Sequence, residues 1–226
     1  TAAHQFNLDS SESGRISDVV TTALSGSAQN MADFSEALKY SGVQLNSIGA
    51  SIEQTSALIM QLADVGVKGA GNALKNLAQR LNANRDKLEA LGVSVADSNG
   101  VFREIPDILA DLKEKTAGFS DTERAAFFKQ TFGANFTAPI QSLVDHAADI
   151  ATKVETLNNA NGATARAVEQ MSAGVSALVS GLSSKLEALV IKIGDALKPL
   201  TEGFLESLDD FVKGFSESIT PFLDEI

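Results

Sequence analysis

The sequence contains no cysteine and no tryptophan, and it has only one tyrosine and two histidines. The lack of cysteine excludes a disulfide framework, a thiolate zinc site and a thiol nucleophile. It is compatible with a cytosolic origin, because thiols stay reduced in that compartment. No apolar run reaches the roughly 18 residues that a membrane-spanning helix needs. The two histidines are not at metal-ligand spacing, so no metal and no cofactor are predicted.

Charge is unevenly distributed along the chain. The 18 basic and 29 acidic residues give a net charge of -11. Residues 75–129 are neutral, with nine groups of each sign, whereas residues 130–226 carry six basic and thirteen acidic groups. This acidic excess argues against specific nucleic-acid binding, because that affinity depends on Lys and Arg. The 44% of hydrophobic residues indicates a folded chain.

Helical patterning dominates the sequence, so the predicted fold class is mainly all-α. Apolar residues recur at spacings of three and four in most segments. Two segments have the pattern of a capping box, in which a hydroxyl at the first position is followed three residues later by Glu or Gln. These segments begin at Ser51 and at Ser120. Another helix begins near Met31 and is predicted to end at Ser41 and Gly42, with a short separate helix after it.

One segment departs from the helical pattern, and another stands out by its aromatic content. Residues 93–104 alternate apolar and polar side chains around Asn99 and Gly100, a dipeptide typical of tight turns, and so predict a small β-hairpin. Five of the twelve phenylalanines lie between residues 119 and 136. Such a density of aromatic rings predicts a core cluster.

A long apolar stripe runs through the C-terminal part of the chain. From Val168 to Phe222 its members recur about every 3.6 residues, the period of a straight amphipathic helix. We therefore predict two parts: a helical domain over residues 1–160, with the hairpin at about 93–104, and a long amphipathic helix over residues 161–226, kinked at Pro199. The candidate residues for self-association or partner binding are Val175, Leu178, Leu182, Leu186, Leu189, Ile193, Leu197, Leu200, Phe204, Leu208, Phe211 and Phe215.

The apolar stripe must be buried against something, and the sequence allows three possibilities. The stripe can pack against the rest of the chain, against other copies or a partner groove, or against lipid. From residue 168 onward, four Lys stand against ten acidic residues. An anionic membrane would repel that acidic face, which makes lipid the weakest of the three covers.

Motifs for catalysis are not found. Residues 66–71 are rich in glycine and include Lys68, but they lack the Gly-Lys-Ser/Thr ending of a phosphate-binding loop, so a turn between helices is predicted. No second histidine and no cysteine lies at metal-ligand spacing from His146. On a helix His146 and Asp149 would share one face, and we predict that they form a solvated surface pair. No catalytic residues are assigned, and an enzyme is not predicted.

The order of several short segments resembles the tail tape measure proteins of long-tailed bacteriophages. Each segment is a weak signal alone, but together they cover roughly residues 10–200 in the family's order. The segments are residues 34–40, 51–59, 62–69, 73–77, 91–95, 99–103, 106–109, 122–126, 132–133 and 191–200.

The resemblance implies a structural virion protein in the lumen of the tail tube or tip. Proteins of this family set tail length, are coated by assembly chaperones in the host cytoplasm, and are ejected ahead of the DNA. It also implies contacts with the tail tube and the tail hub or tip, contact with the host membrane on ejection, and a homo-oligomer, for which a trimer is expected. Because the chain is short for this family and begins at Thr1, we expect it to be a portion of a longer protein. The alternatives are a membrane-active protein and a helical partner-binding module.

Overall fold

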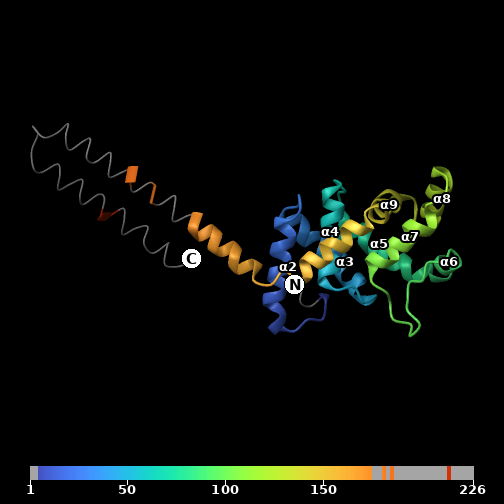
Figure 1. Ribbon diagram of the computed structural model, residues 1–226, viewed down its shortest axis with the longest axis horizontal. Coiled ribbons are helices and arrows are strands. Elements are labelled where there is room, and N and C mark those ends of the chain that lie inside the picture. The colour runs from blue at the N-terminus through green and yellow to red at the C-terminus, as the bar shows by residue number, and fades with distance from the viewer. Residues whose placement is uncertain (1–4, 175–179, 182–183, 186–212, 215–226) are drawn as a thin grey trace, which may run out of the picture. The chain divides into compact units, whose positions relative to one another are not determined.

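A computed structural model describes residues 5–174, 180–181, 184–185 and 213–214. The chain divides into two compact units, Thr1–Thr164 and Ala165–Ile226. Within its described residues, the first unit contains α-helices and two short 3₁₀-helices (Figure 1). In chain order they are η1 (Ser10–Glu12), α2 (Ser13–Ser25), α3 (Met31–Ser47), α4 (Ile52–Asp64), α5 (Ala70–Ala83), α6 (Arg85–Ala90), α7 (Ile105–Thr116), α8 (Asp121–Phe132), η2 (Ala134–Phe136), α9 (Thr137–Asp145) and α10 (Ala147–Asn158). The mainly all-α prediction is confirmed.

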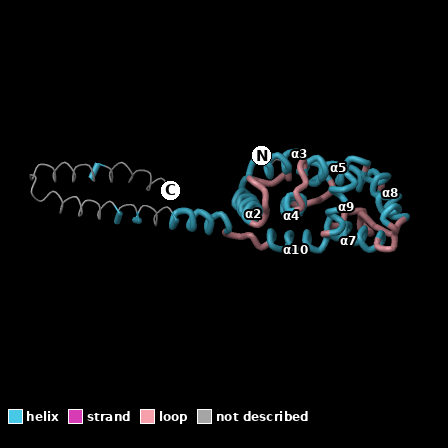
Figure 2. Tube along the Cα trace, turned by 90° about the horizontal axis from the view of Figure 1, so that it is seen from above, coloured by secondary structure: helices cyan, strands magenta, loops and turns pink. Residues whose placement is uncertain are grey.

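Helix α4 is the centre of the first unit. It contacts α2, α3, α5, α9 and α10, which lie around it (Figure 2). Every residue from Ile52 to Leu62 is buried, including several with polar side chains. A helix that is covered on all sides has no solvent face to hold its polar groups. Glu53, Gln54 and Gln61 find partners on other elements, whereas the hydroxyls of Thr55 and Ser56 have no hydrogen-bond partner.

The predicted β-hairpin at residues 93–104 is wrong. Among the described residues no strand is formed, and this segment holds a single antiparallel bridge between Ala96 and Phe102. The Asp97 side chain accepts hydrogen bonds from the backbone N–H groups of Asn99 and Val101, each at 2.9 Å. A carboxylate that binds these N–H groups closes the turn locally, so the flanking chain does not extend into a ladder.

The predicted break at Ser41 and Gly42 is also wrong, because α3 runs through both residues. The Ser41 hydroxyl donates to the Ala37 carbonyl at 2.8 Å, a bond that keeps the polar side chain inside the helix. Gly42 faces the N-terminal segment, where an added Cβ would lie 3.2 Å from the Phe6 ring. The glycine here serves close packing and does not end the helix.

The two predicted capping segments behave differently. At Ser120 both bonds form: its hydroxyl accepts from the Glu123 N–H, and the Glu123 carboxylate accepts from the Ser120 N–H at 2.9 Å. Hydrogen bonds from the hydroxyl and N–H of Ser120 lower the pKa of Glu123. At Ser51 the hydroxyl caps the Gln54 N–H at 3.1 Å, but the Gln54 side chain instead accepts from the Ile105 N–H at 3.4 Å.

The aromatic cluster predicted between residues 119 and 136 is present in the first unit. Phe128 and Phe132 are fully buried, with ring centroids 5.8 Å apart in a stacked arrangement. Phe127 meets Phe128 edge-on at 5.5 Å. The Arg124 guanidinium lies over the Phe128 ring at 5.5 Å from its centroid. The cluster fixes α8 by ring packing at its inner face.

The second unit is described only in part. Helix covers residues 163–174, and within it Val168 and Met171 are 48% and 72% exposed. The twelve candidate residues from Val175 to Phe215 and the predicted kink at Pro199 all lie outside the described residues. In the part of the chain that is described, no helix is both long and apolar enough to cross a membrane.

Candidate functional site

The junction between α10 and the next helix is held by α2. The Asp18 carboxylate accepts hydrogen bonds from the backbone N–H groups of Gly162 at 2.7 Å and Thr164 at 2.8 Å. The hydroxyls of Thr21 and Thr164 lie 3.3 Å apart. These N–H groups belong to the start of the helix over residues 163–174, where no carbonyl of the same helix can accept them. Asp18 therefore caps a helix that is more than 140 residues distant in sequence.

Replacing Asp18 by Ala removes this cap, so we expect the first turn of the helix to fray. Loss of a capping side chain typically costs about 1 kcal/mol, which corresponds to amide exchange roughly fivefold faster at Gly162 and Thr164. Hydrogen exchange followed by NMR measures the effect. Asp86→Ala, on the exposed surface of α6, is the control and should leave both amides unchanged. Unchanged protection in Asp18→Ala would show that the carboxylate does not hold the helix start.

Two of the polar side chains on α4 pair with residues that are distant in the sequence. The Glu53 side chain, 4% exposed, forms an ion pair with Arg15 of α2. Further along α4, Gln61 accepts a hydrogen bond from the Lys153 ammonium at 2.7 Å, and Lys153 also lies 3.3 Å from Asp64. These contacts join α2 and α10 to the central helix. Their role is structural, and the sequence pattern does not reveal them.

The glycine-rich segment forms a turn between α4 and α5, as predicted. Gly66 has a positive φ of 75°, and the Val67 N–H donates to the Leu62 carbonyl at 2.8 Å, which ends α4. A cleft of about 490 Å³ lies between this turn and α3, and Lys68, Asp33, Glu36 and Tyr40 are among its lining residues. Because charges of both signs line this cleft, its geometry does not indicate a phosphate site.

The remaining candidate for a chemical role is His146, whose ring makes a hydrogen-bond contact one helical turn earlier in the chain. Its Nδ1 atom lies 2.8 Å from the Ser142 carbonyl oxygen, and the neighbouring Asp145 pairs with Arg124. Within the described residues, no group of three or more His, Cys, Asp or Glu side chains is arranged to hold a metal ion. The described residues thus offer helix-joining contacts and surfaces, without a catalytic constellation.

Comparison with known proteins identifies the chain's relatives. The family model for phage-related minor tail proteins matches residues 1–133. The chain is 30% identical over 181 residues to the tape measure protein of Pneumococcus phage Dp-1, which covers 77% of this chain and 16% of that protein. It is 32% identical over 139 residues to the probable tape measure protein of Escherichia phage P2, covering 57% of this chain and 17% of that protein. No solved structure matches.

The family match agrees with the resemblance found in the sequence. The chain spans about one sixth of the length of these two relatives. The matched region of the family model includes α2 to α8, which form most of the packed first unit. The chain therefore belongs to the family of phage-related minor tail proteins, and its predicted likeness to tail tape measure proteins is confirmed.

Proposed function

We propose that this chain is a portion of a tail tape measure protein that sets tail length during assembly. The observation that carries the proposal is the 30% identity to the Dp-1 tape measure protein over 77% of the chain. Since that match covers only 16% of the relative, this portion contributes one segment of a longer rod. The role is structural, without catalysis and without a cofactor.

Two parts of the chain have separate roles in this proposal. Residues 1–160 form a packed helical domain, and residues 161–226 form the long amphipathic helix that associates with other copies through its apolar stripe, from Val175 to Phe215. A trimer is the proposed assembly. The exposure of Val168 and Met171 supports it, because both stand at helical spacing at the start of the stripe and are left uncovered.

The proposed location is the lumen of the tail tube or tip. The protein would be assembled in the host cytoplasm with tail assembly chaperones, contact the tail tube and the tail hub or tip, and leave ahead of the DNA, touching the host membrane on ejection. The family match supports a tail component, and the net charge of -11 supports low affinity for the DNA that follows.

Shortening the parent gene in frame tests the ruler function. We expect the tail to shorten in proportion to the number of residues removed, as measured by electron microscopy of particles. The control replaces the deleted stretch with an unrelated helical sequence of equal length, which should keep the tail length of the parent. Tails of unchanged length after the deletion would rule out the ruler function.

Polar substitutions in the stripe test self-association. Leu186→Asn and Ile193→Asn together should convert the oligomer to a monomer, because they remove apolar area from the proposed interface. Ser183→Asn and Ala188→Asn, which introduce the same residue off the stripe and change no charge, are the matched control. If light scattering gave the same mass for the parent, the stripe variant and the control, the stripe would be rejected as the interface.

A further inference from the structure

The basic residues of the first unit fall into two groups. Residues 1–164 contain 13 Lys and Arg. Six of them form ion pairs and Lys113 donates to the Asp145 carbonyl, which accounts for seven. In the described part of the chain, no carboxylate lies within 4.0 Å of the other six, which are Lys39, Lys68, Lys75, Arg80, Lys87 and Lys129. Among these six, Lys87 donates a hydrogen bond to the side-chain oxygen of Gln130 at 3.5 Å.

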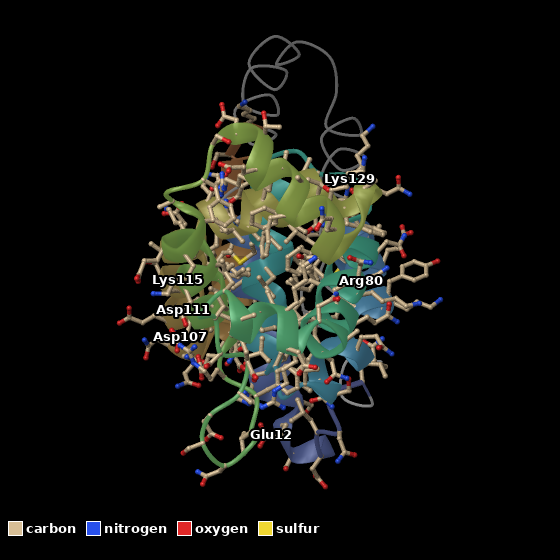
Figure 3. All side chains as sticks on the ribbon, turned by 90° about the vertical axis from the view of Figure 1, so that its right-hand side faces the viewer. Glu12, Arg80, Asp107, Asp111, Lys115 and Lys129 are labelled. Carbon is tan, nitrogen blue, oxygen red and sulfur yellow. The ribbon has the colours of Figure 1, made fainter. Side chains whose placement is uncertain are left out.

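These six cations lie on α5 or on elements next to it. Lys75 and Arg80 are on α5 itself, and Lys68 is in the turn that precedes it. The other three are on α3, α6 and α8, each of which contacts α5. All six are exposed. Figure 3 shows Arg80 and Lys129 on one side of the molecule and Asp107, Asp111 and Lys115 on the opposite side.

The surface around α5, defined by these six cations, is here called the α5 face. Helix α5 contains no acidic residue, and its exposed positions between the cations hold the amides Asn72, Gln79 and Asn82. The neighbouring helices contribute Asp33 and Glu36 from α3, Asp86 and Glu89 from α6, and Asp121 and Glu123 from α8. Of these, Glu89 pairs with Arg85. With Arg85 and Arg124 included, the elements that form the α5 face carry eight basic and six acidic groups, a small positive excess on a protein whose net charge is -11.

Such a separation of charge favours an acidic partner. Neighbouring like charges repel one another, so a cluster of unpaired cations is mildly unfavourable for the folded chain alone. It becomes favourable when a negative surface approaches, because complementary potentials speed the encounter and select the orientation. Helix α3 also exposes the side chains of Met31, Tyr40 and Val43. Because the proposed contact depends on charge, we expect it to be sensitive to salt.

We propose that the α5 face binds the acidic segment 168–226 of a second copy of this chain. That segment carries ten acidic residues against four Lys. Acidic members such as Glu187, Glu206 and Asp210 follow stripe positions by one or two residues, so on a helix they lie off the apolar stripe. The inference rests on the proposed self-association, which would cover the stripe and leave this acidic side available.

DNA is the less favoured ligand for the same face. Residues 1–164 contain 19 acidic groups besides the 13 basic ones, so the domain as a whole repels a polyanion as dense as a duplex. An acidic protein segment carries fewer charges per unit length and can be bound by a local cluster. The head-to-tail contact that results is heterologous, and such contacts extend copies into a row.

Charge reversal in the full chain tests the contact. Lys75→Glu with Arg80→Glu alters the α5 face, and Lys113→Glu with Lys115→Glu makes the same charge change on α7. Sedimentation velocity over a range of concentrations measures association at about 0.05 M and about 0.5 M salt. We expect the face variant to associate about tenfold more weakly at low salt and the α7 variant to resemble the parent. At high salt all three should associate equally, through the stripe alone.

A complementary charge reversal on the segment distinguishes loss of the contact from misfolding of the face variant. Glu206→Lys with Asp210→Lys should weaken the same contact, and mixing this protein with the face variant should restore association at low salt. Equal association of the face variant and the parent would overturn the proposal. If the stripe substitutions left association unchanged at both salt concentrations, only the proposed oligomer would be rejected. The two tests are distinguishable because the stripe contact is expected to persist at high salt and the α5 contact is not.

The absence of cysteine allows the partner to be identified. Gln79→Cys in one chain and Ser207→Cys in another should form a mixed disulfide on oxidation, since the parent has no competing thiol. If a disulfide formed only when one chain carried both cysteines, the segment would bind the α5 face of its own chain. That result would overturn the contact between copies. The proposal would also be overturned if the face variant lost binding to a short DNA duplex while its self-association stayed unchanged.

Discussion

Gly71→Ala should destabilise the first unit by about 1–3 kcal/mol, although alanine is the better helix former. A Cβ on Gly71 would lie 2.7 Å from the Ala37 carbonyl oxygen and 2.9 Å from both the Ala37 Cα and the Tyr40 Cβ. Two of these atoms belong to the backbone of α3, so no side-chain rotation relieves the clash. The two helices must move apart, and other contacts between α3 and α5 are lost with the movement.

Gly14→Ala is the matched control for this prediction. Gly14 is the second residue of α2, as Gly71 is of α5, and an added Cβ there meets nothing within 4 Å. The substitution should therefore raise the free energy of unfolding by roughly 0.5 kcal/mol, through the reduced freedom of the unfolded chain. Urea unfolding followed by circular dichroism measures both variants. Equal changes in the two would show that α3 and α5 do not depend on the close approach at Gly71.

Gly71 also shows what the sequence cannot predict. The glycine-rich pattern of residues 66–71 indicates a turn, and the positive φ values of Gly66 and Gly69 agree with it. Gly71 lies in the same run but has a different role, which depends on Ala37 more than 30 residues earlier. Local pattern identifies residues that bend the chain, whereas a close approach between helices is a property of the packed structure.

Periodicity predicts which segments are helical better than it predicts what surrounds them. The pattern of α4 places Leu58, Ile59 and Leu62 inside, and these are buried. The burial of Glu53 and Gln61 on the same helix could not be read from the pattern, because both are polar and are satisfied by α2 and α10. Likewise, the turn residues Asn99 and Gly100 were correctly located, but Asp97 closes that turn without extended strands.

The candidate surfaces were predictable to different extents. The acidic segment and its apolar stripe are evident from the order of residues alone. The α5 face is not, because Lys39, Lys75 and Lys129 are far apart in the chain and meet only through the contacts of α5 with α3 and α8. The neutrality of residues 75–129 hides it further, since most of the acidic groups in that range lie on other elements.

Arg15→Met should lower the free energy of unfolding by about 2–4 kcal/mol. The Glu53 carboxylate is 4% exposed and pairs with Arg15, whose pKa is raised by its hydrogen bond to Glu12 and by the charge of Glu53. Removing one partner of a fully buried ion pair costs about 3–5 kcal/mol, because the other charge stays buried. The expected value is lower here because the Arg15 side chain is 41% exposed, so water reaches the pair.

A double substitution separates the burial of a lone charge from the loss of side-chain packing. Arg15→Met with Glu53→Met replaces both charges by apolar groups of similar length, and should recover about 1–3 kcal/mol relative to Arg15→Met alone. Arg85→Met breaks the exposed pair with Glu89 and should cost about 0.5 kcal/mol or less. If the double variant were as unstable as Arg15→Met, the isolated Glu53 charge would not be the cause, and the contact of Arg15 with α4 would stabilise the unit through packing of its side chain.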